Sequence, residues 1–270
     1  MIDIIIDKSG FQKILLQEKL KIYGFLAKLF LKSRINRTYD IVNADYDLGS
    51  WNRNIDKIDF DTHYGKTEKN DMVIFTYNGG LFKDTRSRFE KKYNSMLVDI
   101  LSEYKEESVV ELGCGIGVHQ FLLYSKGFQK LEGYDLSENA ISVNKQYSDK
   151  KEIPILFNVH DLNQPFAENM IKNKVIFTHA CLEQCHMIMA NVLHNIFQGK
   201  PKIVINFEVD YDSSPLMVKK HFDSQGYQNN LVRELKKLEK EKKIEIISIE
   251  KLPLSLSPFN RLSAIIWKIK

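Results

Sequence analysis

The sequence predicts an α/β fold in which helices cover both faces of a mostly parallel sheet. Two observations support this class. From about residue 105 onward, short apolar runs alternate with segments whose apolar residues recur about every 3.6 positions, as in repeated βαβ units. Near the carboxyl end, two apolar runs follow one another with no helix between them, which predicts a hairpin that places one antiparallel strand in the sheet.

Five short apolar runs supply the expected parallel strands, and two segments of helical period lie between them. The expected strands cover residues 108–112, 131–134, 154–159, 175–178 and 203–207, and the expected helices cover residues 116–126 and 187–197. Gly127 and Gly199 follow these helices, at the position where a glycine commonly closes a helix. Residues 244–249 and 262–269 form the closing hairpin.

The first part of the chain has a different character, which divides the sequence into residues 1–104 and 105–270. Its expected elements are an amphipathic, lysine-rich helix at 11–31, a polar and aromatic loop at 45–54, a short apolar run at 72–77 that ends in Asn78-Gly79-Gly80, and a helix at 87–104. We therefore expect the N-terminal region to be mostly helical and to lead directly into the first strand of the sheet.

Composition and charge exclude several classes of protein. Hydrophobic residues make up 43% of the chain, which is enough for a packed core. The 39 Lys and Arg against 35 Asp and Glu give a net charge of +4, and the mixed charge run at 236–243 suits a solvated helix face. Three cysteines, acidic residues near the start and the lack of an apolar run of roughly 20 residues favour a cytoplasmic protein without stable membrane insertion. No nucleic-acid partner is expected.

A glycine-rich turn at residues 111–117 carries the most specific chemical information. It reads Glu-Leu-Gly-Cys-Gly-Ile-Gly, follows an expected strand and begins an expected helix. Glycines in this context let the chain turn sharply and let a ligand lie against bare backbone. A dinucleotide fingerprint would need a glycine where Val118 stands, and a phosphate-binding P-loop would need Gly-Lys-Ser/Thr. The turn is therefore not specialised for a pyrophosphate.

Acidic residues follow the next two expected strands. Asp135 lies 22 residues after Gly113, where a carboxylate can accept both hydrogen bonds of a ribose diol. Asp161 ends the third strand, where it can accept from the amino group of adenine. Glu111 begins the turn and can either hold its geometry or face a cationic ligand.

The segment from about residue 107 to the end resembles the class I S-adenosylmethionine-dependent methyltransferases. The resemblance rests on the turn at 111–117, on Asp135, on Asp161 and on the run 175–183, in which Glu183 begins a helix. It implies an enzyme with a seven-stranded Rossmann-like sheet whose last strand is antiparallel, S-adenosylmethionine as cofactor, and a lid at residues 1–104 that determines acceptor specificity. The implied cofactor-binding residues are Glu111, Gly113, Cys114, Gly115, Gly117, Asp135, Leu136, Asp161, Leu162 and Thr178, with Tyr77 and Arg88 as partners of the methionine carboxylate.

Candidate catalytic residues follow the fourth expected strand. His179 can serve as a base or as an acceptor ligand, and it can equally be a histidine that hydrogen-bonds beside the cofactor; Glu183 is the second candidate. Four potential metal ligands lie within 179–186, namely His179, Cys181, Cys185 and His186. Their spacing does not match the paired ligands of zinc sites, so no metal is expected.

The acceptor class is inferred by exclusion. Methyltransferases of nucleic-acid amino groups carry an Asn/Asp-Pro-Pro-aromatic turn after the fourth strand, whereas residues 178–181 read Thr-His-Ala-Cys. We expect a small polar acceptor, either sugar-like or phosphorylated, methylated on oxygen or nitrogen by a monomer or homodimer. A protein, RNA or lipid-linked acceptor, a non-catalytic cofactor-binding partner protein and a nicotinamide-linked reductase remain alternatives.

Overall fold

The computed structural model describes residues 12–13, 38, 41–42, 44, 71–185, 189–255 and 261–270. Gln12–Lys13 form a two-residue strand, β1, where the sequence predicts the first turn of a helix. The rest of that expected helix, the loop expected at 45–54, and His186 lie outside the described residues.

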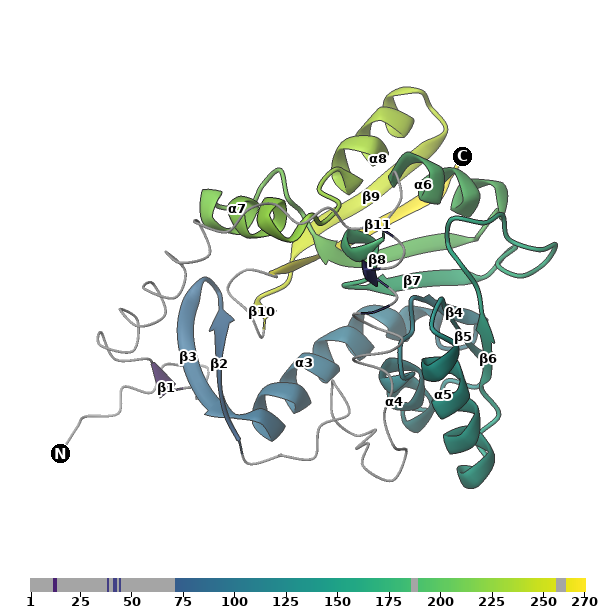
Figure 1. The fold of residues 1–270 in the computed structure, drawn as a ribbon, viewed down its shortest axis with the longest axis horizontal. Coiled ribbons are helices and arrows are strands. Elements are labelled where there is room, and N and C mark those ends of the chain that lie inside the picture. The colour runs from purple at the N-terminus through teal and green to yellow at the C-terminus, as the bar shows by residue number, and fades with distance from the viewer. Residues whose placement is uncertain are drawn as a thin grey trace.

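A seven-stranded sheet forms the centre of the molecule, with strand order β6-β5-β4-β7-β8-β11-β9 (Figure 1). Its strands are β4 (Val109–Leu112), β5 (Leu131–Asp135), β6 (Leu156–Val159), β7 (Val175–His179), β8 (Ile203–Val209), β9 (Ile244–Lys251) and β11 (Leu262–Ile269). Strand β11 runs antiparallel to both β8 and β9, whereas the pairs among β4 to β8 are parallel. The predicted α/β class, the strand number and the antiparallel last strand are confirmed.

Helices cover both faces of this sheet because the buried strands present apolar side chains alternately to each side. Phe177 and Ile176 of β7, for example, belong to two different core clusters. One cluster includes residues of α3 (Arg86–Leu101), α4 (Val118–Ser125), α5 (Glu138–Lys151) and α7 (Leu216–Gln225). The other includes residues of α6 (Met189–Gln198) and α8 (Leu231–Lys240).

The two glycines expected to close helices have different roles. Gly127 follows α4 with a φ of 89°, so it is the left-handed closing residue that the sequence predicts. The prediction is wrong for Gly199, because the left-handed residue after α6 is Lys200, with a φ of 51°. Gly199 is instead confined by packing, since a Cβ atom there would lie 2.4 Å from Cδ1 of Ile171.

The described part of the N-terminal region contains a hairpin that the sequence analysis did not predict. Strands β2 (Met72–Tyr77) and β3 (Gly80–Thr85) are antiparallel and are joined by Asn78 and Gly79, both with positive φ. A two-residue Asn-Gly connection is a strong hairpin signal, because both positions of this turn type need positive φ. Over residues 72–85 the region is therefore β-structure rather than helix.

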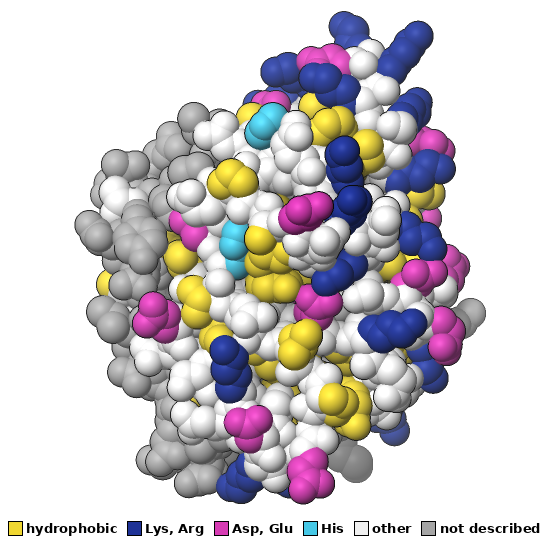
Figure 2. All heavy atoms as spheres, turned by 90° about the vertical axis from the view of Figure 1, so that its right-hand side faces the viewer, with side chains coloured by type: hydrophobic (Ala, Val, Ile, Leu, Met, Phe, Trp, Pro, Cys, Tyr) yellow, Lys and Arg dark blue, Asp and Glu magenta, His cyan; other side chains and the backbone are white. Residues whose placement is uncertain are grey.

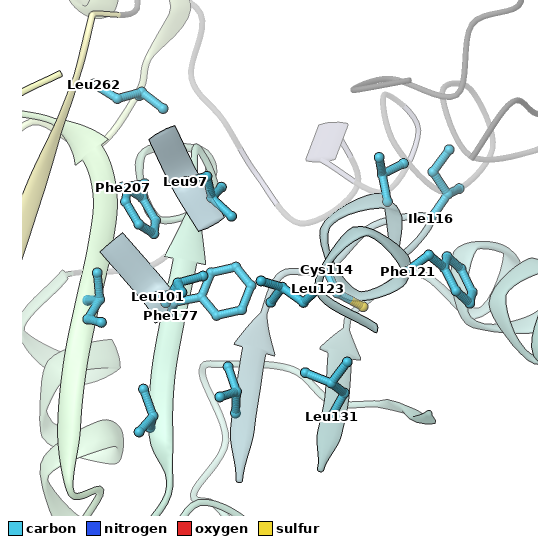
Figure 3. Close-up of a cluster of buried hydrophobic side chains, with 14 of the residues drawn as sticks. Leu97, Leu101, Cys114, Ile116, Phe121, Leu123, Leu131, Phe177, Phe207 and Leu262 are labelled. Atoms are coloured by element: carbon cyan, nitrogen blue, oxygen red, sulfur yellow. The ribbon is translucent and has the colours of Figure 1, made fainter. Parts of the chain in front are cut away.

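Two connections join the hairpin to the central sheet. Helix α3 begins at the end of β3, where Thr85 caps it, and it places Leu97 and Leu101 beside Phe177 and Phe207 (Figure 3). The two-residue strand β10 (Leu254–Ser255), from the connection between β9 and β11, pairs with β2 and completes a second sheet of order β1-β3-β2-β10. The division of the chain at residue 104 stays a prediction.

The expected solvated charge run forms the end of α8 and the turn after it. Lys and Arg side chains gather at the top of Figure 2, the end of the molecule where Figure 1 draws α8. The lysines from 236 to 243 are all exposed, and Glu241 pairs with Lys243 at 2.8 Å. Among the described residues, no helix combines the length and apolarity needed to cross a bilayer.

Candidate active site

The candidate site lies where the strand order reverses, between β4 and β7. Chain connections leave the sheet in opposite directions at such a point, so the carboxyl ends of the two strands border a crevice in which α/β proteins bind ligands. Leu112 of β4 pairs with Thr178 of β7, so the glycine turn after β4 and His179 at the end of β7 are neighbours. The site predicted from two separate segments of sequence therefore forms one edge of the sheet.

The glycine turn needs glycines for its backbone and for its packing. Gly113, Gly115 and Gly117 have φ values of 75°, 51° and 69°, in the left-handed region that favours glycine. A Cβ atom on Gly113 would lie 2.0 Å from Sγ of Cys181, so the turn after β7 packs directly against the turn after β4. The buried Cys114 follows Gly113, and burial raises the pKa of its thiol well above its usual range.

Asp135 joins the end of β5 to the glycine turn. One oxygen of its carboxylate accepts from the backbone N–H of Gly115 at 2.7 Å, and the other accepts from the N–H of Ser137 at 2.8 Å. The half-buried Leu136 lies between Asp135 and Ser137 in the chain. The structure thus brings Asp135 to the turn, as the sequence predicts.

Asp161 and Leu162 follow the neighbouring strand β6. The half-buried Asp161 accepts from the N–H of Asn163 at 3.0 Å. Leu162 is buried in the core cluster that contains α6 and α8. Because His160 donates its backbone N–H to the carbonyl of Asp135, the ends of β5 and β6 remain adjacent beyond the strands.

Glu111 is buried and does not face solvent. Only 1% of the residue is exposed, and its Oε1 lies 2.7 Å from Nδ1 of His119 in the first turn of α4. Burial raises the pKa of the Glu111 carboxyl, and His119 opposes this increase. Of the two roles expected for Glu111, this pairing matches the one that holds the geometry of the turn. The sequence analysis did not identify His119.

His179 is the point at which three elements meet. Its Nε2 lies 2.5 Å from the hydroxyl of Tyr93 on α3, and its ring centroid is 4.4 Å from that of His119 on α4. Ala180, the next residue, has a φ of 47° and turns the chain sharply after β7. Tyr93 was also missed, although it lies on the stripe Phe89, Tyr93, Leu97 and Leu101 that α3 buries. A tyrosine hydroxyl on a buried helix face needs a hydrogen-bond partner, and this requirement could have indicated from the sequence that Tyr93 contacts a polar group.

Thr178 and Glu183 both contact residues of β8, the strand next to β7. Thr178 is fully buried and accepts from Asn206, which in turn accepts from Trp267. Glu183 is 4% exposed and lies beside the buried Glu208. Burial and the facing Glu208 raise the pKa of Glu183 well above its usual range, which favours the protonated form of this carboxyl.

The cysteines near this edge are free thiols. Oε1 of Glu208 accepts from the backbone N–H groups of Cys181 and Leu182, which fixes the short helical turn η4 (Leu182–Gln184). A hydrogen bond with Cys185, together with burial, raises the pKa of Cys181 well above its usual range. Within the described ranges, no three His, Cys, Asp or Glu side chains are arranged to hold a metal ion.

Tyr77 and Arg88 lie in the hairpin and at the start of α3. Lys92 lies 4.9 Å above the Tyr77 ring, and the exposed guanidinium of Arg88 pairs with Asp84 at 2.8 Å. These contacts join neighbouring residues of one segment. The expected role of Tyr77 and Arg88 toward a methionine carboxylate therefore stays a prediction.

Comparison with solved structures supports the fold. The PH0226 protein of Pyrococcus horikoshii OT3 is 17% identical, and the alignment covers 68% of this chain and 91% of that one with a TM-score of 0.50. Magnesium protoporphyrin IX methyltransferase from Synechocystis PCC 6803, solved with bound SAH, is 13% identical over 68% of this chain and 87% of its own, with a TM-score of 0.52. No family model matches the sequence. No curated protein matches it either. At these identities the comparison shows a shared fold.

Proposed function

We propose that this protein is a methyltransferase that uses S-adenosylmethionine. The observation that carries the proposal is the position of Asp135. Its carboxylate lies at the end of β5 and contacts the G-x-G-x-G turn next to the point where the strand order reverses. The Synechocystis enzyme with the same fold was crystallised with SAH, the demethylated form of this cofactor.

The residues at this edge fit such a cofactor. Asp135 is a carboxylate at the end of β5, the residue type that accepts from ribose hydroxyls, and Asp161 after the adjacent strand can accept from the adenine amino group. The turn brings the backbone N–H of Gly115 to the Asp135 carboxylate. When bound, the cofactor supplies a sulfonium methyl group that is already activated for transfer. The protein must then hold the acceptor in line with that methyl group, which can lower the barrier by about 7–11 kcal/mol.

His179 is the proposed base for an acceptor hydroxyl. It lies at the end of β7, next to the glycine turn, and its Nε2 hydrogen-bonds with the Tyr93 hydroxyl. A hydroxyl loses a proton during methylation, and a neutral imidazole can take it. Glu183 is less suited to this role, because it is buried against Glu208, and this burial raises the pKa of its carboxyl. We propose a small polar acceptor, since the net charge of +4 is too small and too dispersed for a dedicated nucleic-acid surface.

Calorimetry with S-adenosylhomocysteine tests the cofactor assignment, with NAD as the matched control. We expect saturable heat with S-adenosylhomocysteine and none with NAD. The opposite pattern would replace the proposal by a nicotinamide-dependent one, and an absence of heat with both ligands would contradict cofactor binding.

Labelled S-adenosylmethionine tests turnover and the acceptor class. The protein is incubated with the labelled cofactor and with separate small-molecule, protein and RNA fractions of a cell extract. We expect label in the small-molecule fraction, and we expect less label with His179→Gln. Transfer to protein or RNA would favour those acceptors instead, and binding without any transfer would indicate a non-catalytic partner protein.

A further inference from the structure

The first turns of α3 extend past the carboxyl ends of the central strands, toward β2 and β3 (Figure 1). Leu97 and Leu101 of this helix pack in the core cluster of the sheet. One turn earlier, Tyr93 contacts His179 at the end of β7. Arg86 lies two turns before Tyr93, on the same face of the helix and about 10 Å further along its axis. Arg86 therefore lies beyond the sheet edge at which the acceptor is proposed to bind.

Arg86 is a largely buried cation whose hydrogen bonds are incomplete. Its side chain is 12% exposed, and Nη1 lies 3.6 Å from Oε1 of Glu90, an ion pair that is too long for a hydrogen bond. Nε and Nη1 are both buried, and neither has a hydrogen-bond partner among the described residues. A guanidinium offers five N–H donors and keeps its charge in proteins, so burial without partners is costly. The folded chain thus leaves two donor nitrogens of Arg86 unused.

Asn94 has an unused polar atom on the same ridge of α3. Residues 86, 90 and 94 are spaced four apart, so their side chains are neighbours along the helix surface. Oδ1 of Asn94 is buried and has no hydrogen-bond partner in the part of the chain that the structure describes, although the residue is partly exposed. Buried polar groups are nearly always hydrogen-bonded, so two incomplete residues on one ridge indicate that a polar ligand completes them.

The mixture of donors and acceptors favours a hydroxylated ligand over an anion. Arg86 offers N–H groups, whereas Oδ1 of Asn94 needs a donor. A hydroxyl group both donates and accepts, so the hydroxyls of one ligand can pair with both side chains. An anion would suit Arg86 alone, and it would also meet the carboxylate of Glu90 beside the guanidinium.

We propose that Arg86 and Asn94 bind hydroxyl groups of the methyl acceptor, and that this acceptor is a sugar or a similar polyhydroxylated molecule. The inference rests on the proposed function, because it identifies the substrate class of the same site. It agrees with His179 as the base, since a hydroxyl acceptor must lose a proton when it is methylated.

The substrate class is tested with the small-molecule fraction of a cell extract and labelled S-adenosylmethionine. One portion of the fraction is treated with periodate, which cleaves vicinal diols, and the reagent is quenched with ethylene glycol before the full-length protein is added. A portion that receives periodate already quenched is the control. We expect the treatment to remove most of the label transfer. Undiminished transfer would overturn the inference, whereas lack of transfer in every portion would refute the proposed function.

Urea denaturation of the protein without cofactor or acceptor tests whether the Asn94 oxygen is kept for a ligand. Asn94→Leu should leave the midpoint unchanged, because the oxygen that it removes has no partner among the described residues. Asn195→Leu is the matched control: Nδ2 of the buried Asn195 donates to the carbonyl of Leu162, so its midpoint should fall by roughly 0.5 M. An equal fall in both variants would make Asn94 a structural residue and overturn its role.

Transfer by the variants tests the contacts with the acceptor. Arg86→Gln should raise the amount of the small-molecule fraction needed for half-maximal transfer about tenfold, and Asn94→Leu about fivefold. Lys91→Gln, at an exposed cation of the same helix, is the control and should not change it. An unchanged requirement in both variants would overturn the inference. A fall in affinity for S-adenosylhomocysteine in Arg86→Gln would also overturn it, because the guanidinium would then belong to the methionine carboxylate.

Discussion

The two halves of the candidate site are built in different ways. On the β5 and β6 side, Asp135 bonds to the N–H of Ser137 two residues later and to the N–H of Gly115 20 residues earlier, and Asp161 bonds to the N–H of Asn163. On the β7 side, His179 contacts a tyrosine 86 residues away, and Cys181 is held by Glu208, 27 residues away. The first half is a motif that a short stretch of chain can encode, whereas the second half exists only in the folded protein.

The two halves also differ in the surroundings of their carboxyl groups. Asp135 is a half-buried carboxylate that accepts from backbone N–H groups, which stabilises its ionised form. Glu183 is a buried carboxyl beside a second carboxyl, which favours its protonated form. The β5 side therefore presents a carboxylate held by backbone N–H groups, and the β7 side contains a buried pair of carboxyl groups. Four substitutions test this difference, from the largest expected effect to the smallest.

Gly113→Ala should have the largest effect on stability, because it disrupts the packing of the turn after β4 against the turn after β7. The new Cβ would lie 2.0 Å from Sγ of Cys181 on a backbone with a φ of 75°. Strain and overpacking together should lower the free energy of unfolding by about 2–6 kcal/mol, as measured by urea denaturation. In a Cys181→Gly background the same change should cost less. Equal costs in both backgrounds would show that the two turns are not in contact.

Asp135→Asn should lower the affinity for S-adenosylhomocysteine by about tenfold. The amide keeps one acceptor oxygen but loses the charge and one of the two backbone contacts, and a tenfold loss corresponds to about 1.4 kcal/mol. Asp161→Asn is the matched control, since Asp161 bonds to one backbone N–H, and we expect a loss of about threefold. Calorimetry measures both. An equal affinity for Asp135→Asn and wild-type protein would remove Asp135 from the ribose site.

Glu183→Gln should change the pH dependence of stability rather than cofactor affinity. The pKa of Glu183 is raised in the folded protein, so the folded state holds a proton that the unfolded state releases above the ordinary value of 4.5. Stability should therefore fall as pH rises above 4.5, by at most about 1.4 kcal/mol per pH unit, until the folded pKa is passed. Glutamine does not titrate, so the variant should lose this decline. Urea denaturation from pH 4 to pH 8 measures it, and parallel curves for the two proteins would contradict the buried acid pair.

Arg88→Gln should have the smallest effect on stability, and it tests whether the hairpin region belongs to the cofactor side. The Arg88 side chain is 61% exposed, so loss of its pair with Asp84 should cost no more than about 0.5 kcal/mol. If Arg88 binds the methionine carboxylate, as the sequence predicts, affinity for S-adenosylhomocysteine should fall severalfold while stability hardly changes. An unchanged affinity would assign Arg88 to the surface alone.

Sequence patterns predicted the centre of the sheet well because the central strands β4, β7 and β8 are buried on both faces. Val175–His179 and Ile203–Val209 are short apolar runs that have few alternatives to a central strand. The β2–β3 hairpin was missed although Asn78-Gly79 marks its turn, because the flanking residues are too mixed to show clear alternation. Gly199 was misassigned because its need for glycine comes from Ile171, which is distant in sequence.

The sequence by itself determined the α/β class, the glycine turn and the acids after β5 and β6, because backbone conformation and hydrogen bonds such as those of Asp135 to Ser137 and of Asp161 to Asn163 depend on residues close together in the chain. Only the tertiary structure decided that Glu111, His119, His179 and Tyr93 form one row and that Glu183 is buried against Glu208. The physical reason is that burial and contact between distant side chains depend on how helices pack on the sheet. No local pattern of residues records that packing.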